Sequence, residues 1–171
     1  MRARHLATLL GLSLLLGGCG FALRGTTGGG DYPPVQLQQA HTDNALRRRI
    51  DQQFDMHDID VASSSALTLR ISELERGDSV LSLDSNARTA ERRLLISAKV
   101  DLLRDGETVQ SLRLREQRIL FTDPDNPVGD TTEQQLVIGE LEAAMAEQIV
   151  RQLLHWLDKE QNHAPASRTA R

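Results

Sequence analysis

The spacing of hydrophobic and polar residues predicts four β-strands. Strand-like alternation occurs over residues 35–39, 67–72, 93–103 and 111–115, and the last segment continues towards Phe121. After the second segment, Glu73 and Leu74 break the alternation, which predicts a β-bulge or a bend. Residues 80–83 either extend that strand or form a separate piece. Asp105-Gly106 lies between the third and fourth segments and is a strong signal for a two-residue hairpin turn.

Two further segments have the spacing of amphipathic helices. Leu46, Ile50 and Phe54 recur every four residues, which predicts a helix over about 44–57. Near the C-terminus a broader stripe is formed by Val137, Leu141, Ala144, Met145, Gln148, Ile149, Leu153, Trp156 and Leu157. Thr132 and Gln135 form a capping box. We therefore expect this helix to begin at Thr132, after a loop over 122–131, and to end near residue 158.

The order strand, helix, three strands, helix predicts the fold class. It fits an α+β two-layer sandwich, with two helices packed on one face of a four-stranded mixed sheet. We expect one domain over residues 35–158. The glycine- and proline-containing stretch 19–34 predicts a flexible tether, and the polar stretch 159–171 predicts a disordered tail.

The N-terminus has the pattern of a bacterial lipoprotein signal peptide over residues 1–18. Arg2 and Arg4 precede an apolar run over 6–16, which as a helix spans roughly 17 Å and is too short to cross a membrane. Leu-Gly-Gly-Cys, ending at Cys19, resembles a lipobox. This predicts cleavage before Cys19 and the addition of a diacylglycerol and an N-acyl chain to it. The alternative is an ordinary signal peptide followed by an incidental cysteine.

The residues around Cys19 also predict where the chain resides. Two or three acyl chains anchor a protein firmly, whereas one chain binds a membrane only marginally. Gly20 follows the cysteine, where lipoproteins kept at the inner membrane have Asp. We therefore expect a lipid-anchored protein on the periplasmic face of the cell outer membrane.

Composition excludes several classes of function. The 171-residue chain has 24 acidic and 20 basic residues, a net charge of −4, and only 3% aromatic residues. This argues against a binder of single-stranded nucleic acid, which needs a basic groove and stacking rings. Cys19 is the only cysteine, so the chain forms no intrachain disulfide and no CxxC-type zinc site.

Strand alternation nevertheless predicts a local concentration of positive charge. If the apolar residues of the long strands face the helices, the opposite face displays Arg70, Arg93, Lys99, Arg113 and Arg115. Only Asp101 clearly opposes them, and Leu95 and Leu103 point the same way. Such a face suits an amphipathic polyanion or the inner wall of a large barrel. The alternative is a solvated face on which arginine stems cover apolar surface.

No catalytic constellation is evident. The histidines form neither an HxxxH nor an HExxH pattern, and the serine cluster at 63–65 lacks the GxSxG context of a nucleophile. Asp123, Asp125 and Asp130 lack the spacing of an EF-hand. We expect no enzyme activity, no metal, and no cofactor other than the lipid on Cys19.

The chain resembles the LptE family of lipopolysaccharide-assembly lipoproteins. After the lipobox it reads Cys-Gly-Phe-Ala-Leu-Arg over residues 19–24, as that family commonly begins. The resemblance continues in residues 46–50, 89–91, 96–100, 125–127 and 133–134. It implies an outer-membrane lipoprotein that forms a 1:1 complex with the LptD β-barrel as a plug. It also implies help in barrel assembly and binding of lipopolysaccharide during transport to the outer leaflet.

The resemblance implies contacts with the barrel at Phe21, Leu23, Asn126 and Pro127. The family's basic residues in the loop before the last helix correspond here to an acidic stretch over 123–130. We therefore assign lipopolysaccharide binding to a different set, formed by Arg70, Arg88, Arg93, Lys99, Arg113 and Arg115. The alternative function is an outer-membrane lipoprotein that binds another envelope ligand, such as peptidoglycan.

Overall fold

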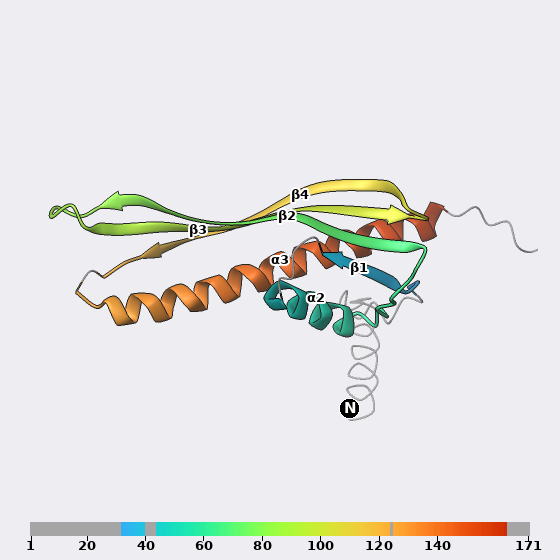
Figure 1. Cartoon of the computed structure of the whole chain (residues 1–171), viewed down its shortest axis with the longest axis horizontal. Helices are drawn as coiled ribbons and strands as arrows, with labels where there is room; N and C mark the ends of the chain where they lie inside the picture. Colours follow the sequence, from blue (N-terminus) through green and yellow to red (C-terminus); the bar gives the residue numbers. More distant parts are fainter. Residues whose placement is uncertain (1–31, 40–43, 124, 164–171) are drawn as a thin grey trace, which may run out of the picture. The chain divides into compact units, whose positions relative to one another are not determined.

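A computed structural model describes residues 32–39, 44–123 and 125–163. Its elements are β1 (Val35–Gln39), α2 (Asn44–Met56), β2 (Leu67–Leu83), β3 (Thr89–Arg104), β4 (Glu107–Phe121) and α3 (Pro127–His163). This is the order predicted from the sequence. Figure 1 shows both helices on the same face of the sheet, which confirms the two-layer α+β sandwich.

The four strands form one mixed sheet in the order β1-β2-β3-β4. β1 runs parallel to β2, and the other two pairings are antiparallel. The predicted hairpin turn between β3 and β4 is confirmed: Asp105 and Gly106 have φ angles of 50° and 85°. Positive φ at both central positions is what a tight hairpin turn with matching twist requires.

β2 changes its surroundings halfway along its length. Of the residues in β2, β1 pairs only with Leu67–Ile71. The pairing with β3 then shifts between Ser72 and Glu75, and Glu73 there has a φ of 50°. This is the predicted bulge. The strand continues to Leu83, so residues 80–83 extend it, and within the sheet this second half has β3 as its only described neighbour.

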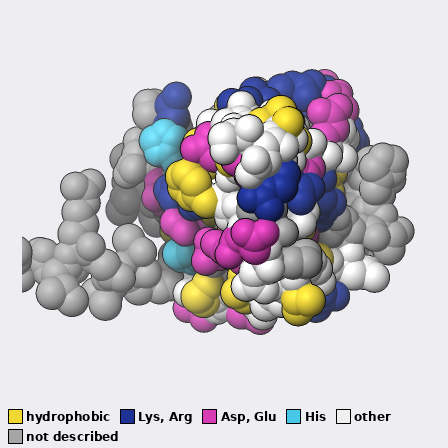
Figure 2. All heavy atoms as spheres, turned by 90° about the vertical axis from the view of Figure 1, so that its left-hand side faces the viewer, with side chains coloured by type: hydrophobic (Ala, Val, Ile, Leu, Met, Phe, Trp, Pro, Cys, Tyr) yellow, Lys and Arg dark blue, Asp and Glu magenta, His cyan; other side chains and the backbone are white. Residues whose placement is uncertain are grey.

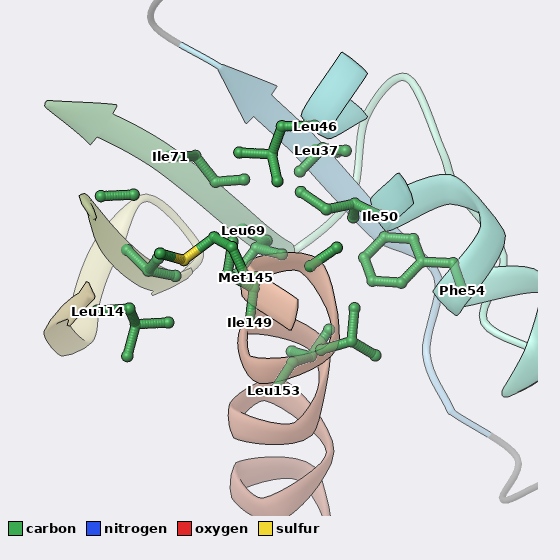
Figure 3. Packing of buried hydrophobic residues seen from close by; sticks show 14 of the residues in the cluster. Leu37, Leu46, Ile50, Phe54, Leu69, Ile71, Leu114, Met145, Ile149 and Leu153 are labelled. Carbon is green, nitrogen blue, oxygen red and sulfur yellow. The ribbon is translucent and has the colours of Figure 1, made fainter. Parts of the chain in front are cut away.

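The core lies between the sheet and the two helices. Leu46, Ile50 and Phe54 of α2 are fully buried, which confirms the predicted stripe. Figure 3 shows these side chains converging with Leu69 of β2 and Ile149 of α3. α3 contributes most of its predicted stripe, and its buried residues include Leu141, Met145, Ile149, Leu153 and Leu157.

The start of α3 differs from the prediction, because the helix begins at Pro127 and not at Thr132. The Asn126 side-chain oxygen accepts a hydrogen bond from the Gly129 backbone N–H at 3.2 Å, as a helix-capping residue does. Proline in the first turn loses nothing, since an N–H there has no helical partner. Thr132 lies inside the helix, and its hydroxyl donates to the Val128 carbonyl at 3.2 Å.

The end of α3 also differs, because the helix continues to His163 and does not stop near residue 158. Arg104 of β3 holds these last turns against the sheet. Its guanidinium lies 5.0 Å from the centre of the Trp156 ring and forms an ion pair with Glu160. This combination of a cation–π contact and an ion pair was not visible in the sequence pattern.

Candidate functional site

The sheet face away from the helices, here called the outer face, carries the predicted cations. Residues that pair directly across antiparallel strands share a face of the sheet. The pairs are Arg70 with Asp101, Ser72 with Lys99, Lys99 with Arg113, Ser97 with Arg115, and Arg93 with Ile119. Their sequence neighbours Leu94, Ile96 and Ala98 are buried on the helix side. The predicted placement of the five cations is therefore confirmed.

The outer face is less cationic than the sequence suggested, because Asp101 is not the only acid on it. Glu73 forms an ion pair with Arg113, and the bulge at Glu73 brings it there. Glu75 pairs with Ser97, in the same cross-strand row as Arg115. Local alternation missed both acids because the bulge shifts the register of β2 at this point.

The cations of the outer face differ in how they are engaged. Lys99 lies 3.7 Å from an Asp101 oxygen, and the Arg70 Nε donates to the Gln38 side-chain oxygen at 3.4 Å. By contrast, Arg93 and Arg115 are exposed and have no hydrogen bond or ion pair with any described residue. These two arginines can bind an incoming anion without first releasing a partner.

Large apolar side chains lie on the outer face at the level of Arg93 and beyond it. Ile119 is 56% exposed and Phe121 is 69% exposed, and both have the same strand parity as Arg115. Leu95 is half-buried on this face, whereas Leu103 is buried. Period-two counting along β4 is the signal that could have added Ile119 and Phe121 to the predicted site. Guanidinium groups beside aliphatic and aromatic surface suit a ligand that is both anionic and apolar.

Arg88 lies apart from this group, in the turn between β2 and β3. Its Nε is 2.9 Å from an Asp84 oxygen, and its Nη1 is 2.9 Å from an Asp125 oxygen. The guanidinium thus joins the turn between β2 and β3 to the loop before α3. Figure 2 shows this end of the molecule, where basic and acidic side chains lie beside one another. Arg88 therefore has a structural role in the fold, whatever it binds.

The same turn perturbs a carboxyl group. The Arg88 backbone N–H donates to Asp84, and this hydrogen bond is the largest cause that lowers the pKa of the Asp84 carboxyl. The Arg88 guanidinium and the Asn86 backbone N–H act in the same direction. The ionised carboxylate is thus the form that holds the turn together.

The other predicted site residues divide into two groups. Asn126 caps α3 through its side-chain oxygen, and Pro127 is the first residue of the helix. Contact of these two residues with the barrel stays a prediction. Cys19, Phe21 and Leu23 lie outside the described residues.

Within the described residues, no group of three or more His, Cys, Asp or Glu side chains is arranged to hold a metal ion. Among the described helices, none is both long and apolar enough to span a bilayer.

Sequence comparison places these features in a family. Residues 32–153 match the LptE family, described as lipopolysaccharide-assembly. The LPS-assembly lipoprotein LptE of Pectobacterium atrosepticum is 29% identical over 164 residues, covering 90% of this chain and 87% of that protein. The LptE protein of Yersinia pestis is 30% identical over 164 residues, covering 90% and 77% respectively.

Solved structures share the fold. The rare lipoprotein B of Shewanella oneidensis has a TM-score of 0.67 at 17% identity, covering 76% of this chain and 99% of that one. A lipoprotein B of Nitrosomonas europaea has a TM-score of 0.69 at 21% identity, covering 85% and 97%. With the family match spanning the sheet and most of α3, the sequence and the architecture agree that this chain belongs to the LptE family.

Proposed function

We propose that this protein is a non-catalytic lipoprotein of the outer membrane that takes part in lipopolysaccharide assembly. In this proposal it forms a 1:1 complex with the LptD β-barrel, lies inside the barrel as a plug and assists its assembly. It also binds lipopolysaccharide during transport to the outer leaflet. Lipid on Cys19 anchors it to the periplasmic face of the membrane.

The observation that carries the proposal is membership of the LptE family across residues 32–153. The relatives from Pectobacterium and Yersinia are named for lipopolysaccharide assembly, and they align with 90% of this chain. The family match includes all four strands, α2 and most of α3. It favours a shared role over a shared fold alone.

The outer face supports lipopolysaccharide as a ligand. Lipopolysaccharide combines phosphate groups with acyl chains. Arg93 lies directly opposite exposed Ile119, and Arg115 lies on the same face two rows away. Guanidinium groups bind phosphate through paired hydrogen bonds, which a single ammonium group cannot reproduce. The apolar neighbours offer surface to the hydrocarbon part of the molecule.

The outer face also suits the wall of a barrel. The interior of a transmembrane β-barrel is polar. The outer face presents serine and glutamine side chains, Ser111 and Gln117 among them, between its charged residues. Both helices pack on the other face of the sheet, so no described helix or strand covers the outer face (Figure 1).

Co-purification tests the proposal. A tagged copy expressed in its Gram-negative host should retain the LptD barrel in equal amount through a detergent wash. Absence of any barrel protein, together with sedimentation of the chain with purified peptidoglycan, would instead support the alternative envelope ligand. Labelled palmitate tests the anchor: incorporation should be lost in Cys19→Ala, and unchanged incorporation would exclude lipidation at that residue.

A further inference from the structure

A mostly apolar opening, here called the window, lies between α3 and the second half of β2. Two polar bridges connect these elements: Arg76 Nη2 lies 2.9 Å from a Glu142 oxygen, and Gln134 Nε2 donates to an Asp78 oxygen at 3.2 Å. Positions 134, 138 and 142 are spaced by four and so lie in one row along the helix. Ile138 therefore lies between the two bridges.

Behind this opening is a cavity of about 120 Å³. Its walls include Gly77, Leu94, Ile96, Ile138 and Leu141. Leu94, Ile96 and Leu141 are buried, whereas Ile138 is half-buried at the opening. β1 does not reach this part of β2, and the described residues place no further strand over it. The cavity thus opens at the edge of the sheet.

The chemistry of the cavity selects an apolar occupant. The polar side chains of the lining, Arg76, Asp78, Gln134 and Glu142, are those of the two bridges, which bind one another. The remaining walls are aliphatic and supply none of the two to four polar partners that a water molecule needs, and a cavity of roughly 150 Å³ lined by apolar side chains can bind a benzene molecule. A space of this size accepts a few carbon atoms. The end of an aliphatic chain fits that description.

Arginine donors beside the window favour a chain that belongs to an anionic molecule, although the rim itself is balanced in charge, since Arg76 pairs with Glu142 and Arg92 with Asp78. Arg76 lines the opening, and Arg92 lies beside it, donating its Nε and Nη2 to Asp78. A guanidinium has five N–H donors, so Arg92 can also bind a phosphate oxygen. The next residue, Arg93, lies on the outer face and has no hydrogen bond or ion pair with the described part of the chain. Arginines therefore lie on both faces of the sheet where β2 and β3 line the window.

We infer that this window, bounded by the two bridges and centred on Ile138, binds the end of an acyl chain of a phosphorylated glycolipid. The inference rests on the proposed function and adds a site to it. The phosphate groups contact the arginines at the rim and on the outer face. The chain end enters between β2 and α3, where it removes apolar surface from water.

A cavity-filling variant tests the inference. The purified protein is titrated with lipopolysaccharide and with the same lipopolysaccharide after its acyl chains have been removed. Ile138→Phe fills the cavity, and Leu136→Phe, at a 65% exposed position of the same helix, is the control. We expect Ile138→Phe to bind intact lipopolysaccharide about tenfold more weakly, with binding of the deacylated form unchanged, and Leu136→Phe to behave as wild type.

The outcomes separate the two proposals. If wild type binds neither form, lipopolysaccharide binding fails and this inference fails with it. If wild type binds the intact form and Ile138→Phe binds it equally well, only the window is overturned. As a check that does not enlarge the side chain, a diazirine-bearing leucine analogue at position 138 should cross-link to lipopolysaccharide in cells. Cross-linking to a polypeptide alone would show that a protein side chain, and not an acyl chain, occupies the window, and would overturn the inference.

Discussion

Arg88 and Asp125 connect two turns that are far apart in the sequence. The Arg88 Nη1 lies 2.9 Å from the Asp125 Oδ1, so the turn between β2 and β3 is joined to the loop that leads into α3. Asp84 completes the arrangement by accepting from both the backbone and the side chain of Arg88. This end of the sheet is thereby held near the start of the long helix.

This arrangement predicts a pH-dependent local opening. The pKa of Asp84 is lowered in the folded state, so its stabilising effect is present above the ordinary value of 3.8 and is lost as pH falls through the lower folded value. The protection of the Asn86 and Arg88 amides against hydrogen exchange, measured relative to the intrinsic rate at each pH, should therefore fall in that acidic range. The same loss of protection should be absent in Asp84→Asn, which lacks the titrating group. Equal pH profiles in the two proteins would contradict the assignment.

The helix cap at Asn126 predicts opposite effects for two glycines of α3. A Cβ at Gly129 would lie 2.4 Å from the Asn126 Nδ2, so Gly129→Ala must displace the cap. Losing a cap costs about 1 kcal/mol, which offsets the helix propensity gained from alanine. At Gly139, apart from its own helix backbone, the only atom of the described residues within 4 Å of such a Cβ is an Arg49 nitrogen at 3.9 Å. Gly139→Ala therefore gains helix propensity without losing a contact.

We therefore expect Gly139→Ala to raise the free energy of unfolding by about 1 kcal/mol and Gly129→Ala to leave it nearly unchanged, as measured by urea denaturation. Combining Gly129→Ala with Asn126→Ala should add little further loss, since both remove the same hydrogen bond. Equal stabilisation by both glycine substitutions would show that Asn126 does not cap α3.

The buried face of α2 predicts a large loss on truncation. Phe54 is fully buried among residues of both helices and the sheet, so Phe54→Ala should lower the free energy of unfolding by about 3–5 kcal/mol. Met56, two residues later, is 65% exposed, and Met56→Ala should change it by less than about 0.5 kcal/mol. Similar effects from both would mean that α2 does not pack as described.

Guanidinium geometry predicts that charge alone does not replace Arg115. If Arg115 binds phosphate through paired hydrogen bonds, Arg115→Lys should weaken lipopolysaccharide binding nearly as much as Arg115→Ala. Arg48→Lys, at an exposed position of α2 away from the outer face, serves as the control and should change little. Full binding by Arg115→Lys would reduce the role of this residue to a simple positive charge.

The sequence predicted those features that depend on neighbouring residues. The Asp105-Gly106 turn, the bulge at Glu73 and the buried stripe of α2 each follow from a few consecutive positions. The start of α3 was wrong because the Thr132 capping box competed with the equally local Asn-Pro signal at 126–127, and packing decides between such signals.

The candidate site was predictable in part for the same reason. Alternation placed Arg93 and Arg115 on the outer face, but not Glu75, which joins that face only through the register shift in β2. The window around Ile138 depends on contacts between β2 and α3, which are separated by more than fifty residues, as in the Gln134–Asp78 bridge with a separation of 56. No local pattern reports such a contact.

The most direct test of the account measures lipopolysaccharide affinity when charge is removed from one face or the other. Arg93→Ala/Arg115→Ala removes two positive charges from the outer face, and Arg48→Ala/Arg151→Ala removes two exposed positive charges from the helix layer. Both variants should fold, because these side chains lie at the surface. We predict at least about tenfold weaker binding for the first variant and near wild-type binding for the second. Equal weakening in both, or unchanged affinity in the first, would contradict binding by the outer face.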